Sequence, residues 1–257
     1  MRFPVIDFHA HVPSPEMFLE YQQIKADLPL EKAVLVSGNM LNPGQLGDFL
    51  RGAIPLNSEM PNNDYLLELV RKYPQEYLAF FTVDPNYHIE EDLEQALEDG
   101  FMGVKLNTIV HRVDFYDKNL ISLLTSIEHT GCPVYTHITL NPQSGIEALV
   151  TLARKFKKLN FVIGHMGFST SDFAAITAAG TNDNIYLETS IGSRLAFKEV
   201  QKRGLVNKLL FGSEFPTHDP QIELEKLKLV FDPSEIEAIC YKNPEALLSW
   251  KTQGVLA

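Results

Sequence analysis

Residues Val5 to Val12 read Val-Ile-Asp-Phe-His-Ala-His-Val, an apolar run that places His9 and His11 one residue apart. In a strand, residues i and i+2 point to the same side, so the two imidazoles can share one cation without backbone distortion. Asp7 has the same parity, and we expect it to support the pair. The pair alone is only suggestive, and its meaning depends on where the other ligand-type residues of the chain fall.

Strand-like and helical segments alternate along the rest of the chain. Segments rich in branched and aromatic residues are Val5–Val12, Lys32–Ser37, Tyr77–Asp84, Phe101–Leu106, Pro133–Ile138, Asn160–His165, Asn184–Thr189 and Lys208–Gly212. Helical patterns are Pro15–Ala26, Asp64–Tyr73, Glu90–Glu98, Lys118–His129, Gly145–Phe156, Ser171–Ala178, Leu195–Arg203, Gln221–Leu229 and Pro233–Trp250. Eight such β/α units predict an α/β fold, a (β/α)8 TIM barrel; a doubly wound open sheet is the alternative.

The length of the chain and the positions of its turn signals are typical of one domain. Its 257 residues, 45% hydrophobic, are enough for a barrel, and the turn signals separate single β/α units rather than blocks of different composition. We therefore treat residues 1–257 as one domain. The exception is Gly38–Asn63, a long connection after the second strand that reads either as a lid over the barrel mouth or as a packed irregular loop.

Charge and cysteine content restrict the class of function. The net charge of −11 argues against nucleic acid or an anionic membrane as partner, because both require a basic surface. A small-molecule substrate is favoured instead. Two cysteines, Cys132 and Cys240, make no disulfide framework, and the chain shows neither a leader nor an apolar run long enough to cross a bilayer. We expect a cytoplasmic enzyme.

Ligand-type residues gather at the ends of the expected strands. They are His9, His11, Lys105, His137, His165 and Glu214. The loops that follow barrel strands converge on one mouth, so side chains at these positions meet there. Agreement among several positions favours a shared site over isolated structural histidines. Arg51, in the long connection, is either a surface charge or an anchor for an anionic substrate. Arg112 is either a substrate contact at the mouth or a solvated loop charge.

Several motifs resemble the amidohydrolase superfamily, and specifically the amidohydrolase-related family (amidohydrolase 2), which includes decarboxylases, hydratases and lactonases of small carboxylated compounds. The resemblance rests on Ile6–His11, Asn63–Pro74, Gly100–Leu106, Pro133–His137, Ile163–Gly167, Phe211–Pro216 and Asn243–Leu248. It implies a metal-centred barrel in which His9, His11 and His137 bind the metal. By the same resemblance Glu214 is a carboxylate ligand and base, and His165 a second acid/base or ligand.

Two positions depart from the family pattern. Glu214 stands where relatives usually have Asp and reaches one methylene further, and Asn107 stands where relatives often carry His. The amide of Asn107 cannot act as acid or base and is left to position substrate. Glu188 and Ser190, at the end of the seventh strand, are either support for a ligating imidazole or an ordinary polar cap.

The predicted function is metal-dependent hydrolysis of an amide, lactone or ester-like bond in a small carboxylated molecule. Imidazole and carboxylate ligands suit Zn²⁺, with Mn²⁺ as the alternative, and we expect one ion rather than two. A metal-activated water would attack, with Glu214 and His165 moving protons. Lys105 meets a substrate carboxylate, is carboxylated to bridge two metals, or snorkels towards solvent. The alternatives for the whole protein are non-oxidative decarboxylation and a catalytically inactive ligand-binding barrel. For the oligomeric state, the sequence leaves open a homodimer paired through the outer helices.

Overall fold

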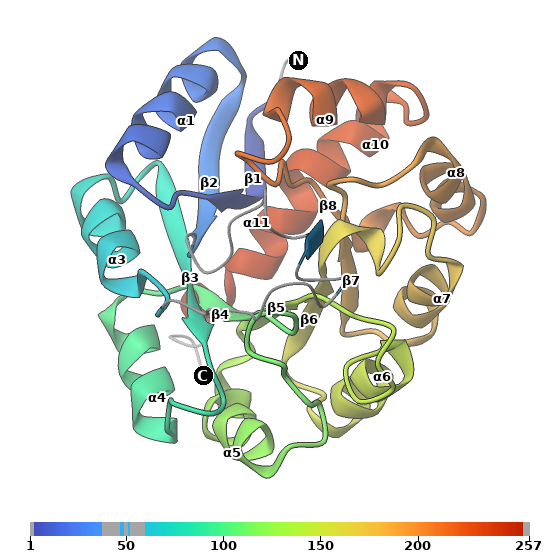
Figure 1. Cartoon of the computed structure of the whole chain (residues 1–257). Coiled ribbons are helices and arrows are strands. Elements are labelled where there is room, and N and C mark those ends of the chain that lie inside the picture. The colour runs from blue at the N-terminus through green and yellow to red at the C-terminus, as the bar shows by residue number, and fades with distance from the viewer. Residues whose placement is uncertain (1–2, 38–46, 49–50, 52–59, 254–257) are drawn as a thin grey trace.

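The computed structural model describes residues 3–37, 47–48, 51 and 60–253. The proposed lid or packed loop at Gly38–Asn63 therefore lies largely outside the described residues. The strands are β1 (Val5–His11), β2 (Leu30–Val36), β3 (Tyr77–Val83), β4 (Gly103–Leu106), β5 (Pro133–Thr136), β6 (Asn160–Ile163), β7 (Ile185–Glu188) and β8 (Leu209–Leu210). They pair in parallel and in chain order, around the centre of the molecule (Figure 1).

The sheet closes on itself between β8 and β1. Phe8 N donates to Phe211 O at 2.8 Å, and His11 N donates to Phe215 O at 2.7 Å. Ala10 and Phe215 also form a parallel bridge. The predicted (β/α)8 barrel is thereby confirmed, and the open-sheet alternative is wrong.

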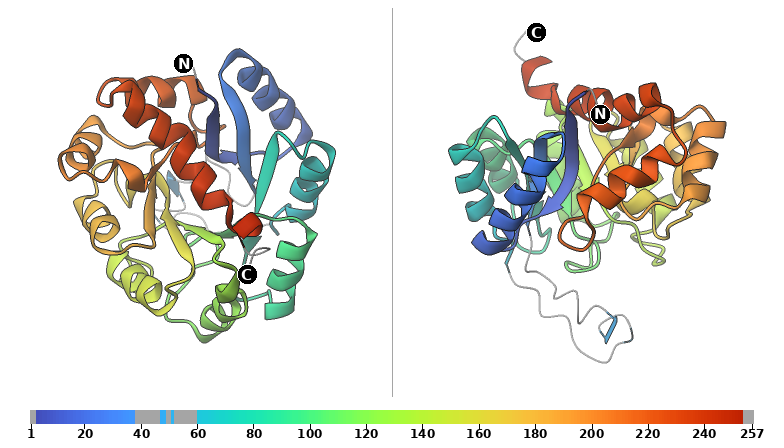
Figure 2. Two further views of the ribbon diagram at one scale, coloured as in Figure 1. Left: turned by 180° about the vertical axis from the view of Figure 1, so that it is seen from behind. Right: turned by 90° about the horizontal axis from the view of Figure 1, so that it is seen from above.

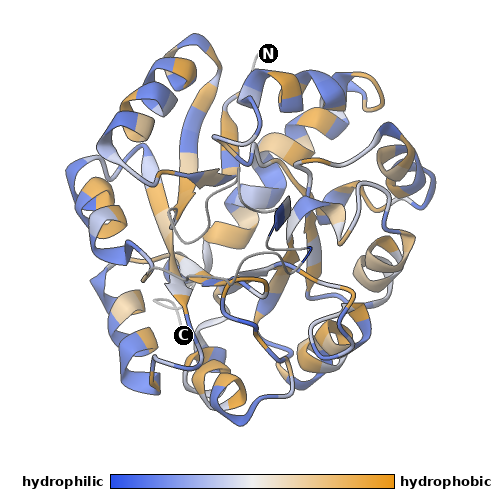
Figure 3. Cartoon of the chain, viewed as in Figure 1, coloured by the Kyte–Doolittle hydropathy of each residue, from blue (hydrophilic) through white to orange (hydrophobic). Residues whose placement is uncertain are grey.

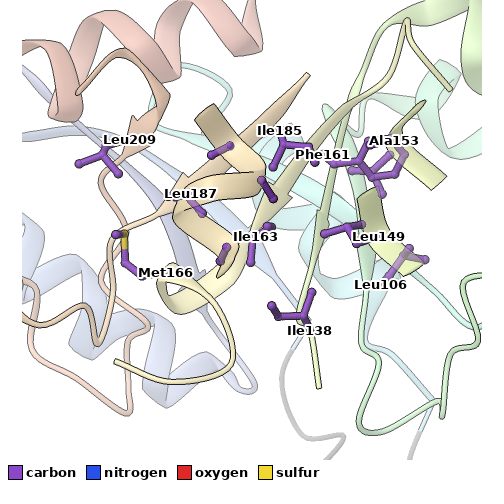
Figure 4. Close-up of a cluster of buried hydrophobic side chains, with 14 of the residues drawn as sticks. Leu106, Ile138, Leu149, Ala153, Phe161, Ile163, Met166, Ile185, Leu187 and Leu209 are labelled. Carbon is purple, nitrogen blue, oxygen red and sulfur yellow. The ribbon is translucent and has the colours of Figure 1, made fainter. Parts of the chain in front are cut away.

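The outer layer consists of α1 (Pro15–Asp27), α3 (Asn63–Lys72), α4 (Glu90–Asp99), α5 (Lys118–Ile127), α6 (Ile146–Lys155), α7 (Phe173–Thr181), α8 (Arg194–Lys202) and α9 (Pro220–Lys228). Several begin at a side-chain cap: Asp117, Asp172 and Asp219 each accept hydrogen bonds from two backbone N–H groups of the first turn. Apolar residues of these helices face the sheet and polar ones face outwards (Figure 3). Figure 4 shows part of the resulting core, where Phe161, Ile163 and Leu187 lie among buried side chains of the helices.

The end of the barrel where the strands start is covered by the C-terminal helices. The sequence predicts one helix over Pro233–Trp250, but it is divided into α10 (Pro233–Glu237), a π-helical turn (Ala238–Lys242), α11 (Asn243–Leu248) and α12 (Trp250–Gln253). Pro244 lacks the N–H that an unbroken α-helix would direct to Cys240, and Asn243 N bonds instead to Ala238 O. Figure 2 shows these helices crossing the back of the barrel, where Leu247 and Leu248 join the inner core.

A bulge in β1 decides which of its side chains face inwards. The register against β2 shifts between Asp7 and Ala10. Phe8 lies in the inner cluster, whereas the Asp7 carboxylate accepts a hydrogen bond from Tyr21 of the outer helix α1 at 2.7 Å. The expectation that Asp7 shares the side of His9 is therefore wrong, because the bulge reverses the alternation between them. Asp7 supports His9 through the backbone, accepting from His9 N at 3.1 Å.

Both cysteines are buried free thiols. Among the described residues, no helix is long and apolar enough to span a membrane.

Candidate metal centre at the carboxyl ends of the strands

The predicted ligand residues meet at the carboxyl ends of the strands. His9 Nε2 lies 3.1 Å from His11 Nε2, and His137 Nε2 lies 3.1 Å from His165 Nε2. Lys105 of β4 joins the two pairs, because its Nζ lies 3.1 Å from His9 Nε2 and 3.3 Å from His137 Nε2. Residues separated by more than 150 positions in the chain thus form one continuous cluster.

Glu214 brings a carboxylate to the same cluster from the loop after β8. Its Oε2 lies 2.7 Å from His9 Nδ1 and 3.8 Å from His165 Nε2, and its Oε1 lies 3.8 Å from His11 Nε2. His9, His165 and Glu214 each offer one ligand atom, and these atoms all lie within 4.8 Å of one another. The tightest group therefore contains His165, with His11 and His137 adjoining it on either side.

Two of these residues have strained backbones. His165 has φ 60° and Glu214 has φ 59°, in the left-handed region that costs a non-glycine residue roughly 1–2 kcal/mol. Tertiary contacts hold them there: Glu214 N donates to His9 O at 2.9 Å, and His165 N donates to Glu188 Oε2 at 3.2 Å. Strain of this kind concentrates at functional sites, where a side chain must point in one direction.

Burial and charge set the protonation of the cluster. Burial lowers the pKa of His11 to about 3, so its imidazole is neutral near pH 7. Burial also lowers the pKa of Lys105 to about 7, although the carboxylates of Glu214 and Glu188 favour the ammonium. For Glu214, burial favours the neutral acid, but the adjacent His9 and His165 outweigh it and hold the carboxyl pKa well below its usual range. Glu214 is therefore an ionised carboxylate in the same cluster as the neutral imidazole of His11.

The donor set fits a divalent cation. His11 Nδ1 lies 2.7 Å from Ser37 O, and because a carbonyl only accepts, the His11 proton is on Nδ1. Its Nε2 then presents a lone pair to the cluster. Among the described residues, the buried Glu214 Oε2 has no hydrogen bond of acceptable geometry despite its nearness to His9. A bare imidazole nitrogen and an unpartnered carboxylate oxygen are ligands of the kind that Zn²⁺ or Mn²⁺ takes.

A second layer of polar side chains surrounds the cluster. Glu188, fully buried at the end of β7, accepts hydrogen bonds from Tyr135 Oη and Ser190 Oγ, both at 2.8 Å. Glu188 thus contacts groups that support the imidazoles and is more than an ordinary cap. Although burial opposes its charge, the neighbouring imidazoles of His9, with Nδ1 3.5 Å from Glu188 Oε2, and His165 lower the pKa of Glu188 to about 2.

Tyr135 is the site residue that sequence reasoning missed. It is fully buried, and its hydroxyl lies 2.8 Å from His9 Nδ1. The signal was present in the parity of β5, because Tyr135 precedes His137 by two positions and therefore faces the same side.

Lys105 and Asn107 show how this end of the barrel is packed. Lys105 is fully buried with Nζ 3.9 Å from the centre of the Tyr135 ring, so the interpretation that it snorkels to solvent is wrong. Asn107 is also buried, and its Oδ1 accepts from Val110 N at 3.1 Å, which closes a turn after β4.

The two arginines are not brought to the cluster by any described contact. Arg51 is exposed and forms an ion pair with Asp48. Arg112 is exposed in a left-handed conformation with φ 48°. A cavity of about 390 Å³ lies instead at the opposite end of the barrel, where Asn160, Asn207 and Trp250 are among its lining residues, and no residue of the cluster lines it.

Comparison with known proteins identifies relatives over nearly the whole chain. A family model described as amidohydrolase matches residues 6–250. No curated protein sequence matches the chain.

Solved structures with the same fold are numerous, and we describe three. An uncharacterised TIM-barrel protein of Bordetella bronchiseptica is 18% identical with a TM-score of 0.76, covering 97% of this chain and 100% of its own. A probable 2-pyrone-4,6-dicarboxylic acid hydrolase of Acinetobacter baumannii, with citric acid bound, is 18% identical with a TM-score of 0.72, covering 96% and 100%. A 5-carboxyvanillate decarboxylase of Novosphingobium aromaticivorans, with bound manganese, is 14% identical with a TM-score of 0.68, covering 96% and 97%.

Proposed function

Because the chain belongs to the amidohydrolase family, we propose that it is a metal-dependent hydrolase that cleaves an amide, lactone or ester-like bond in a small carboxylated molecule. We assign the metal to His9, His11, His137 and Glu214, with His165 as acid/base or further ligand. One ion is proposed, most simply Zn²⁺, with Mn²⁺ as the alternative.

The observation that carries this proposal is the close approach of unprotonated nitrogen and oxygen atoms that can act as metal ligands. The bare His11 Nε2 lies 3.1 Å from His9 Nε2, and an ionised carboxylate oxygen of Glu214 lies in the same cluster without a hydrogen-bond partner among the described residues. Buried polar atoms are nearly always paired, so this combination supports a cation as their common partner.

The side chains then divide the chemistry between them. A divalent ion held there supplies Lewis acidity for a carbonyl oxygen and for a water molecule. Glu214 accepts a proton at its carboxylate, and His165, with Nε2 3.8 Å from Glu214 Oε2, passes a proton towards the leaving group. Lys105, in its protonated form, places a buried positive charge where negative charge develops on the substrate.

The proposed substrate carries a carboxylate. Lys105 is a basic side chain within the cluster, and the probable pyrone-dicarboxylic acid hydrolase that shares this fold was solved with citric acid bound. We keep Arg51 and Arg112 as proposed contacts for the outer part of an anionic substrate.

The proposal is tested first by metal content. Protein purified without chelator after metal-replete growth should contain close to one ion per chain, and His9→Ala and His11→Ala should lose it. Glu223→Gln is the matched control, because Glu223 is a buried carboxylate of α9 that pairs with Lys226 at 2.7 Å outside the cluster. Metal-free wild type, or metal unaffected by both histidine substitutions, would contradict the assignment.

Turnover is then assayed with carboxylated lactones, amides and aromatic acids. Glu214→Gln should fold and retain the metal partly but lose at least about a hundredfold in kcat, because a carboxamide accepts a proton poorly. A metal-loaded wild type without turnover on the whole panel would favour the inactive ligand-binding barrel.

Decarboxylation is the second candidate, favoured by the manganese-containing 5-carboxyvanillate decarboxylase that shares the fold. In that reaction the carboxylate leaves as CO2 and a proton is delivered to carbon. Release of CO2 from an aromatic acid, with no water added to the product, would select it over hydrolysis.

A further inference from the structure

We propose that Glu188 is a positioning residue that fixes the protonated nitrogen of two site histidines at once, His9 through Tyr135 and His165 through Ser190. The consequence for metal binding rests on the proposed function, whereas the protonation pattern itself does not.

The first branch runs from Glu188 to His9. Tyr135 Oη lies 2.8 Å from Glu188 Oε2 and 2.8 Å from His9 Nδ1. An ionised carboxylate only accepts, so the single phenolic proton is directed to Glu188. Glu214 Oε2 lies 2.7 Å from the same His9 Nδ1 but outside hydrogen-bond geometry, so the hydrogen-bond partner of this nitrogen is Tyr135. The Tyr135 oxygen then accepts from His9, which requires the His9 proton on Nδ1. His9 Nε2 is left as a lone pair that faces His11 and Lys105.

The second branch has the same form. Ser190 Oγ lies 2.8 Å from Glu188 Oε2 and 2.8 Å from His165 Nδ1. The hydroxyl proton is directed to Glu188, and the Ser190 oxygen accepts from Nδ1–H of His165. His165 Nε2 then presents its lone pair to the cluster, 3.1 Å from His137 Nε2. A hydrogen bond at one ring nitrogen fixes the proton there and so sets which nitrogen of the imidazole can bind a metal.

The surrounding fold leaves Glu188 one position. Its Oε1 accepts from Ser190 N at 2.5 Å, and its Oε2 accepts from His165 N at 3.2 Å. Two glycines leave the space this network needs. A Cβ on Gly212 would lie 2.3 Å from Glu188 Oε1, and a Cβ on Gly164 would lie 2.3 Å from Tyr135 Oη.

A carboxamide at position 188 is expected to reverse both branches. Backbone N–H groups donate to both oxygens, at 2.5 Å from Ser190 N to Oε1 and at 3.2 Å from His165 N to Oε2. The amide oxygen keeps the shorter bond at the Oε1 position, so the amide nitrogen takes the position of Oε2 and the longer bond from His165 N is lost. It then donates to the oxygens of Tyr135 and Ser190, whose protons turn towards His9 and His165. Both imidazoles should change from Nδ1–H to Nε2–H. A role that is only structural would leave the ring protons where they are.

The experiment is nitrogen-15 NMR of the metal-free full chain with labelled histidine, which separates protonated from unprotonated ring nitrogens. Wild type should show Nδ1–H for His9 and His165, and Glu188→Gln should show Nε2–H for both. Tyr135→Phe should disturb only His9, and Ser190→Ala only His165. Glu223→Gln and Tyr77→Phe are matched controls in buried positions outside the network and should change neither.

Zinc titration gives the second readout. Glu188→Gln should weaken Zn²⁺ binding by about 10- to 100-fold, the usual effect of losing a group that orients a ligand. Unchanged ring protons in a folded Glu188→Gln variant would overturn the proposal. If that variant does not fold, the two single-hydroxyl variants decide the matter by the same signals. A wild type that binds no zinc but shows the expected ring protons would overturn the proposed function and leave this inference standing.

Discussion

Gly212→Ala tests how tightly the network around Glu188 is built. The added Cβ would lie 2.3 Å from Oε1, 2.6 Å from Cδ and 2.8 Å from Cγ of Glu188. An ordinary contact is 3.4 Å or more, so the carboxylate must move by about 1 Å (3.4 − 2.3) and lose hydrogen-bond geometry. Hydrogen bonds to a charged group are worth about 1.5–3 kcal/mol each, so the loss of two lowers the free energy of unfolding by roughly 3–6 kcal/mol.

The assay is urea unfolding followed by circular dichroism, with Gly204→Ala as control. Gly204 has φ 68° with nothing within 4 Å of an added Cβ, so its substitution costs only the backbone penalty of about 1–2 kcal/mol. In a Glu188→Ala background, Gly212→Ala should cost far less than in wild type, because the clashing carboxylate is gone. Gly212→Ala that is no more destabilising than Gly204→Ala, or that costs the same in both backgrounds, would refute this packing.

Three further predictions concern stability and metal. Burial raises the pKa of Tyr77 to about 12, so the folded state keeps the phenolic proton that the unfolded chain loses near pH 10. Stability should fall between pH 10 and 12, and Tyr77→Phe should lose roughly 1 kcal/mol less than wild type from pH 9 to 11 in urea unfolding; equal losses would contradict this. Asp7→Asn should lower the free energy of unfolding only slightly, because His9 N and Ser213 N both donate to Oδ1, and the hydroxyls of Tyr21 and Ser213 at Oδ2 can rotate to accept from the amide. Asp7→Ala should lower it by roughly 3–5 kcal/mol in the same assay. Similar losses in the two variants would show that these hydrogen bonds do not matter. Zinc at a hundredfold excess over its Kd should raise the free energy of unfolding of wild type by about 2.7 kcal/mol and that of His11→Ala by much less, and equal shifts would remove His11 from the site.

The barrel was predictable because its signals are local. Each strand carries its own branched and aromatic residues, each helix its own apolar face, and the turn residues separate them. The convergence of His9, His137, His165 and Glu214 followed from one topological rule, that loops after parallel strands open at the same end.

What the sequence could not supply depends on contacts between distant segments. The bulge that turns Asp7 outwards arises where β1 pairs with β2 and contacts the loop after β8. No residue within β1 predicts it from the sequence alone. The complete burial of Lys105 depends on the surrounding strands. The helix expected over Pro233–Trp250 is divided because Pro244 interrupts its hydrogen bonds, a local signal that the apolar periodicity concealed.

The central claim is that imidazoles and a carboxylate from separate strands hold one divalent ion. Anomalous X-ray scattering from crystals of protein purified without chelator tests it directly. The account predicts a single peak at the metal absorption edge, bounded by the side chains of His9, His11, His137 and Glu214. Metal-replete crystals with no peak there, or with the peak elsewhere in the molecule, would contradict it.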